Sequence, residues 1–212
     1  MDFRTKENQV ADFLREGIIS GQFARGARLK QAEIAVTLGL SITPVREALK
    51  LLEAEGYVTG RSHHGVTVAP FDPTASAEIL DLRVALEDRL TRAAIPLLTD
   101  ADIAGLHAIQ ADFEAAVAKG ERARVRGINY RFHRLLYATA KRPQTLHFVQ
   151  ILWARYPFDL INSLEDRVTR AVHEHRALMQ CVAARDVEGA SSAMRAHLTS
   201  GWEELQPSLT AR

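Results

Sequence analysis

The chain has 212 residues, 47% of them hydrophobic and 25% charged, and its formal net charge is +1. This composition is ordinary for a soluble globular protein of one large domain or two small ones, and it gives no global electrostatic argument for nucleic-acid binding. A single cysteine, Cys181, excludes a disulfide framework within the chain and suits a reducing cytoplasm. The sequence has neither a signal-peptide core nor an apolar run of membrane-spanning length, so we expect a cytoplasmic protein with no membrane partner.

Residues 1–70 combine helix and strand signals. Apolar residues recur at helical spacing within 8–21 and 31–39, and Gly21 and Gly39 stop these two helices. A third helix starts near residue 42. The segments 57–59 and 66–69 are rich in β-branched and aromatic residues and flank a polar turn, which predicts a hairpin. Pro70 and Pro73 then break the chain, so we place a linker at residues 71–73.

The third helix, within residues 41–58, has two different faces. One is an apolar stripe with the spacing i, i+3, i+4 and i+7: Val45, Ala48, Leu49 and Leu52. Ser41 or Thr43 can cap its start, and Gly56 can end it. The opposite face carries Arg46 and Lys50 beside Ile42. That face is either an ordinary solvated surface or a surface that meets phosphate.

The charge around this helix is uneven. Between residues 22 and 50 we count two acidic residues, Glu33 and Glu47, against five basic ones, which makes a local net charge of +3: Arg25, Arg28, Lys30, Arg46 and Lys50. Three helices followed by a hairpin are the order of a winged helix-turn-helix, whose second motif helix enters the DNA major groove. We therefore predict DNA contacts from these positions: Arg28, Lys30, Ser41, Ile42, Thr43, Arg46, Lys50, His63, His64 and Gly65.

Within this set the residues have different expected roles. Arg46 is suited to a guanine edge or a phosphate, and Lys50 to a phosphate. The backbone amide of Thr43 lies at the positive end of the helix and suits phosphate as well. His63 and His64 fall at the tip of the wing, where they would meet the minor groove.

Residues 74–212 have a purely helical pattern. Helical periodicity recurs in six segments: 74–98, 100–119, 121–140, 143–162, 165–184 and 187–205. Burying that many amphipathic stripes favours an all-α bundle. The predicted fold is therefore mostly α, with a winged helix-turn-helix over 1–70, a linker over 71–73 and a helical bundle over 74–212.

Three histidines lie on the apolar faces of three separate predicted helices: His133, His175 and His197. A single such histidine is more often a hydrogen-bonded core residue, but each of three buried imidazoles needs its own partner. A divalent cation would satisfy all three at once, with the carbonyl of Asn129 as a fourth ligand one helical turn before His133.

The first region resembles the DNA-binding domain of the GntR family of bacterial transcription regulators. The resemblance rests on "TPVREAL" at residues 43–49, on Leu52 to Gly56, and on Gly65 to Val68 in the wing. It implies DNA binding as a homodimer to a palindromic operator. The family usually has an arginine where this chain has Ile42, and isoleucine donates no hydrogen bond, although it can contact a thymine methyl. This departure puts the operator sequence in question more than the activity.

The second region resembles the FCD effector-binding domain of the FadR subfamily. The resemblance implies an all-helical domain that holds a metal, often zinc or nickel, through the positions matching Asn129, His133, His175 and His197, and that binds a small carboxylate near it. The asparagine stands where aspartate is commoner; it keeps an oxygen ligand but removes a negative charge. Arg83 matches an arginine near the effector pocket, and an ion pair with Glu87 is an equally weighted alternative for it.

The leading hypothesis is a ligand-responsive transcriptional regulator, so we do not expect an enzyme. Repression that is relieved by ligand is the default in the family that the chain resembles. One alternative is a metal-dependent hydrolase, for which three histidines and an oxygen ligand are the right ligand types. A hydrolase needs a general base, and we expect Glu174 to face away because neighbouring helical residues point about 100° apart. Another alternative is a metal sensor, in which the metal itself is the signal.

Overall fold

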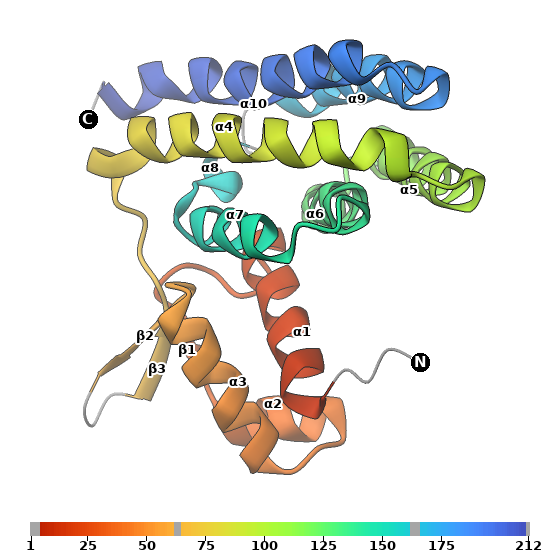
Figure 1. Ribbon diagram of the computed structural model, residues 1–212. Coiled ribbons are helices and arrows are strands. Elements are labelled where there is room, and N and C mark those ends of the chain that lie inside the picture. The colour runs from red at the N-terminus through yellow and green to blue at the C-terminus, as the bar shows by residue number, and fades with distance from the viewer. Residues whose placement is uncertain (1–4, 62–64, 162–165, 211–212) are drawn as a thin grey trace.

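The computed structural model describes residues 5–61, 65–161 and 166–210 (Figure 1). Its helical part lies at one end of the molecule and its small sheet and two short helices at the other, and helix α1 runs between them. This arrangement confirms the predicted fold class, a winged helix-turn-helix followed by an all-helical region. None of the described helices is long and apolar enough to cross a membrane.

The first region contains three helices, α1 (Lys6–Ser20), α2 (Gln31–Leu38) and α3 (Ile42–Ala54). Glycines in the left-handed conformation follow all three, Gly21 and Gly39 directly and Gly56 after the cap residue Glu55. The apolar stripe predicted for α3 is buried. Ser41 occupies the N-cap position of α3 as expected, but its side chain makes no capping hydrogen bond.

The sheet has three antiparallel strands in the order β1 (Arg28–Leu29), β3 (Gly65–Val68), β2 (Val58–Arg61). The hairpin of β2 and β3 was predicted from the β-branched and aromatic residues on both sides of a polar turn, and β1 was not predicted. β1 is only two residues long, and it exists because Arg28 and Leu29 pair with Thr67 and Val66 far along the chain. So short a segment carries no periodic signal of its own.

The helical region follows a stretch without helix or strand at residues 69–72 and the 3₁₀ turn η1 (Pro73–Ala75). Its helices are α4 (Ser76–Ala94), α5 (Asp100–Ala118), α6 (Arg122–Thr139), α7 (Pro143–Arg155), α8 (Phe158–Ile161), α9 (Arg167–Ala184) and α10 (Val187–Thr210), with the 3₁₀ turn η2 (Ile95–Leu97) after α4. The segment predicted as one helix over 143–162 is in fact two, because Pro157 lacks an amide donor and the chain turns at Tyr156.

Helix α10 packs against α4 and α9, and α5 packs against α6 and α9. In Figure 1, α4, α9 and α10 form the upper layer, and α6, α7 and α8 lie beneath it. Helix α1 packs on both α3 and α6, so it belongs to the first region and also touches the second. One hydrophobic core continues from α1 and α3 into α4, α6, α7, α9 and α10.

Polar contacts reinforce this junction. The Tyr57 hydroxyl donates to the carbonyl of Gln150 at 2.8 Å, and Arg25 donates to the carbonyl of Tyr156 at 2.9 Å. Arg126 on α6 donates to the carbonyl of Ser20 at the end of α1 at 2.5 Å. The two regions are therefore joined by specific contacts as well as by a shared core.

Candidate functional site

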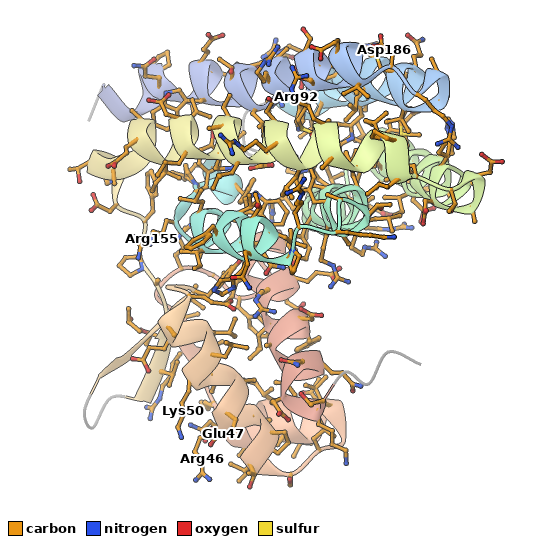
Figure 2. All side chains as sticks on the ribbon, in the orientation of Figure 1. Arg46, Glu47, Lys50, Arg92, Arg155 and Asp186 are labelled. Atoms are coloured by element: carbon orange, nitrogen blue, oxygen red, sulfur yellow. The ribbon has the colours of Figure 1, made fainter. Side chains whose placement is uncertain are left out.

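The outer face of α3 carries the side chains predicted to read DNA. Ser41, Ile42, Thr43, Arg46 and Lys50 are all exposed, while the opposite stripe is buried in the first region. Figure 2 shows Arg46 and Lys50 on α3 at the end of the molecule away from the helical region. This face is therefore free of the rest of the described chain.

Glu47 lies between the two cations of this face. Its carboxylate is 3.1 Å from Nζ of Lys50 and 3.6 Å from Nε of Arg46. All three side chains are about half exposed, so these ion pairs contribute little to stability and are easily exchanged for pairs with phosphate.

The other predicted contact residues flank α3. Arg28 and Gly65 are exposed on neighbouring strands, and Lys30 is exposed and paired with Glu33 at 2.7 Å. His63 and His64 lie outside the described residues. Arg25, which we counted in the local basic patch, instead binds carbonyls at the junction of the two regions and does not belong to this surface.

The helical region brings together the three histidines that the sequence singled out. His133 on α6, His175 on α9 and His197 on α10 are all buried, and one ligand atom from each lies within 4.8 Å of the others. We call these three residues the histidine cluster. The imidazole rings of His133 and His197 are stacked with their centroids 5.1 Å apart.

Each imidazole of the histidine cluster is oriented through its Nδ1 atom by a chain of hydrogen bonds that ends on a carboxylate. His197 donates directly to Glu174 at 2.7 Å. The other two chains each have an intermediate residue: His133 to Tyr137 at 3.4 Å and on to Glu87 at 2.8 Å, and His175 to Gln110 at 3.0 Å and on to Glu114 at 2.9 Å. With Nδ1 occupied in all three rings, Nε2 is the nitrogen that remains for a metal.

Two buried polar atoms beside the cluster make no hydrogen bond with any described residue. They are Nε2 of His175 and Oδ1 of Asn129. Asn129 precedes His133 by one turn of α6, as predicted. Because unpartnered buried polar atoms cost free energy, a ligand for both atoms is the physical expectation. A divalent cation fits these nitrogen and oxygen donors.

The electrostatic environment keeps the imidazoles neutral. Burial lowers the pKa of His133 and His175 well below the usual value, and each histidine is further disfavoured as a cation by its neighbours in the cluster. Burial also lowers the pKa of His197. Burial alone would raise the pKa of Glu174, but hydrogen bonds from His197 and Arg167 lower it. Neutral imidazole is the form that binds metal.

The prediction that Glu174 faces away was wrong. Its carboxylate reaches His197 on α10 at 2.7 Å and also pairs with Arg167 at 2.8 Å. The geometry of one helix could not reveal a contact between two. Gln110 was not predicted either, because no local motif connects it to the cluster.

Two cavities adjoin the cluster and share Arg83, Asn129, Phe158 and His197 among their lining residues. The first extends toward α1, where Ile19 lines it. Arg83 is buried, and both of its expected roles fit: its Nε is 2.7 Å from Glu87, and it lines both cavities. Its guanidinium also lies 4.1 Å from the ring centroid of Tyr156.

Comparison with known proteins is consistent with this geometry. Residues 6–68 match the bacterial regulatory proteins of the gntR family, and residues 78–200 match the FCD domain. The chain is 29% identical to the HTH-type transcriptional regulator McbR of Escherichia coli (strain K12), over 85% of this chain and 84% of that protein. It is 31% identical to the "Probable D-xylose utilization operon transcriptional repressor" of Paenarthrobacter nicotinovorans, over 92% and 87%.

The solved structure of E. coli McbR/YncC superposes with a TM-score of 0.84 at 25% identity, and covers 98% of this chain and 100% of that one. The chain therefore belongs to the gntR family of bacterial transcriptional regulators and carries an FCD domain. Its first region is the DNA-binding domain of such a regulator.

The neutral imidazoles predict a pH dependence of stability for chelator-treated protein. Unfolded histidines take up protons near pH 6.5, and the buried cluster does not, so the unfolded state binds more protons below that pH. We expect the free energy of unfolding to fall as the pH is lowered from 7 to 5, by up to about 1.4 kcal/mol per pH unit for each buried imidazole. Urea denaturation at a series of pH values measures it. A free energy that stays constant over this range would contradict the neutral cluster.

Proposed function

We propose that this regulator is a homodimeric repressor of the FadR subfamily that binds a palindromic operator and responds to a small carboxylate bound at a divalent metal. The single observation that supports the metal most strongly is the histidine cluster with its oriented Nδ1 atoms and the unpartnered Oδ1 of Asn129. Zinc and nickel both accept this mixed nitrogen and oxygen set. The relative named as a repressor supports the direction of regulation.

In this proposal Asn129 and the histidine cluster hold the cation, and Arg83 receives a carboxylate in the adjoining cavities. The metal supplies open coordination positions for ligand oxygens. The guanidinium of Arg83 is held in place by Glu87 and by the ring of Tyr156, so little conformational freedom is lost when it binds an anion.

A homodimer is expected from the small size of the DNA-binding domain. One winged helix contacts a short run of base pairs, and two heads related by a two-fold axis read two half-sites of a palindrome. Arg46 and Lys50 would then contact each half-site, with Ile42 placed to touch a thymine methyl.

Substitution of Arg46 tests the reading face. We expect Arg46→Ala to weaken binding to the duplex flanking the gene by about 10- to 100-fold, which corresponds to about 1–3 kcal/mol for one good base contact. Fluorescence anisotropy at fixed salt with non-specific competitor measures the dissociation constant.

The matched control for Arg46→Ala is Arg142→Ala, which removes an exposed arginine of the helical region. The control should bind as the wild type does. Equal losses in both variants would mean that general positive charge, and not the outer face of α3, carries the binding.

A continuous chain of ion pairs links helix α6, which carries two of the proposed metal ligands, to helix α3 of the DNA-binding domain. Arg134, which follows His133 on α6, is 3.1 Å from Asp12 on α1. Asp12 is 2.8 Å from Arg15, and Arg15 is 2.7 Å from Glu55, the cap residue of α3. Arg15 and Glu55 are both buried. A shift of α6 on ligand binding would therefore change the partners of the helix that reads DNA.

Asp12→Asn tests this connection because it keeps the shape of the side chain and removes its charge. We expect the change in operator affinity produced by zinc to shrink by about 0.5–2 kcal/mol in this variant. Operator binding is measured with zinc and after chelation, and circular dichroism checks the fold.

The control for Asp12→Asn is Glu16→Gln. Glu16 also pairs α1 with α6, through Arg131 at 3.5 Å, but both side chains are more than a third exposed. If the two variants reduce the zinc effect equally, the chain of ion pairs from Arg134 to Glu55 is not the connection.

A metal sensor is the second candidate for the same site. Both candidates predict that zinc changes operator affinity, but only the carboxylate receptor predicts a further change when a carboxylate is added to the zinc-bound protein.

A further inference from the structure

The donors of the histidine cluster carry no charge. Three imidazoles bind a cation in their neutral form, and Asn129 offers a carbonyl oxygen where a carboxylate would have brought a negative charge. A divalent cation held by these four groups would keep both of its positive charges.

The surrounding carboxylates do not compensate for these charges, because each already has its own arginine. The closest distances are 2.7 Å for Glu87 to Arg83, 2.8 Å for Glu174 to Arg167 and 2.6 Å for Glu114 to Arg176. The three pairs together contribute no net charge around the cluster. Glu204, which also lies 3.8 Å from Arg167, pairs with Arg170 at 2.6 Å.

The cation would also be shielded from water. His133, His175 and His197 have exposed fractions of 5%, 0% and 7%. An uncompensated charge is costly in such an environment, and the cost falls when a counter-charge binds beside it. Two negative charges are needed to balance a divalent ion here, and the described residues around the cluster supply none.

We propose that the histidine cluster binds its divalent cation together with a small dicarboxylate, so that metal and effector each depend on the other for tight binding. This inference rests on the proposed function and adds the charge of the effector to it. The reason lies in Asn129, whose side chain is neutral: the ligand supplies negative charge that this position does not.

The cavities beside the cluster are suited to the two ends of such a dianion. Their volumes are about 30 Å³ and 40 Å³, and a water molecule needs about 10–15 Å³ on this measure, so each cavity accepts a group of the size of a carboxylate. The second is lined by Tyr156 and the first by Tyr130, whose hydroxyl is buried without a hydrogen-bond partner among the described residues. A phenol donates well to a carboxylate.

The test is a zinc titration of the full chain followed by calorimetry, in chloride, acetate, malonate or succinate at one ionic strength. For the wild type we expect the zinc affinity to rise about 5- to 150-fold with malonate or succinate, which is the usual range of coupling between two ligands, and less with acetate. By reciprocity, zinc should raise the dicarboxylate affinity by the same factor.

The matched variant is Asn129→Asp, titrated in the same buffers so that binding of zinc by the free dicarboxylate affects both proteins equally. We expect it to bind zinc more tightly than the wild type in chloride and to gain less from the dicarboxylate. The reciprocal titration on the wild type needs no variant, so the inference stays testable if Asn129→Asp folds poorly.

The possible failures are distinct. If zinc binds the wild type equally well in chloride and in both dicarboxylates, and His175→Gln abolishes that binding, the metal site stands and the mutual dependence is wrong. If neither the wild type nor Asn129→Asp binds zinc in any of the buffers, the metal part of the proposed function fails together with this inference.

Discussion

The chains of hydrogen bonds that lead from the three buried imidazoles to carboxylates, directly for His197 and through one residue for His133 and His175, are the constraint around which the helical region is built. A buried imidazole without hydrogen-bond partners has no interaction that fixes its orientation. Here Glu174 and the pairs Tyr137–Glu87 and Gln110–Glu114 hold each Nδ1, which leaves Nε2 of each ring for a ligand. One ligand atom from each of the three rings lies within 4.8 Å of the others. The histidines come from α6, α9 and α10, and their partners come from α4, α5, α6 and α9. The arrangement exists only when these helices are packed together.

The same packing connects the cluster to the DNA head. Helix α6 carries Asn129 and His133 on one side, and on the other it contacts α1 through ion pairs with Asp12 and Glu16. Helix α1 in turn supports α3, whose outer face is left exposed. Because a packed interface has few alternative arrangements, we expect a displacement of α6 to move α1 as well.

Periodicity and spacing were sufficient for the fold class and for placing the three histidines on apolar helix faces, because each helix, and the face on which each histidine lies, is marked by a pattern within that helix. The short strand β1, the break at Pro157 and the contact of Glu174 with His197 were missed. The strand and this contact depend on pairs of residues that are far apart in the sequence, and no local pattern reports them. The break at Pro157 had a local signal in the proline itself, which the apolar periodicity on both sides outweighed.

The two expected positions of Arg83 are compatible with each other. An ion pair with Glu87 was one expectation and a place beside the effector pocket was the other, and the side chain satisfies both geometries at once. Its buried partner Glu87 fixes its position, as the anion receptor that we propose would require.

The most direct test of this account is the zinc affinity of Glu174→Gln, because that substitution keeps the size of the side chain. Of the three described hydrogen-bond chains, it weakens the one in which a carboxylate contacts an imidazole directly. Glu188→Gln is the control: it also removes an arginine-paired carboxylate, but Glu188 is an exposed residue at the start of α10. The account predicts that Glu174→Gln binds zinc about 10- to 100-fold more weakly than the wild type, and that the control binds normally. Unchanged zinc affinity in Glu174→Gln, with the fold intact, would contradict it.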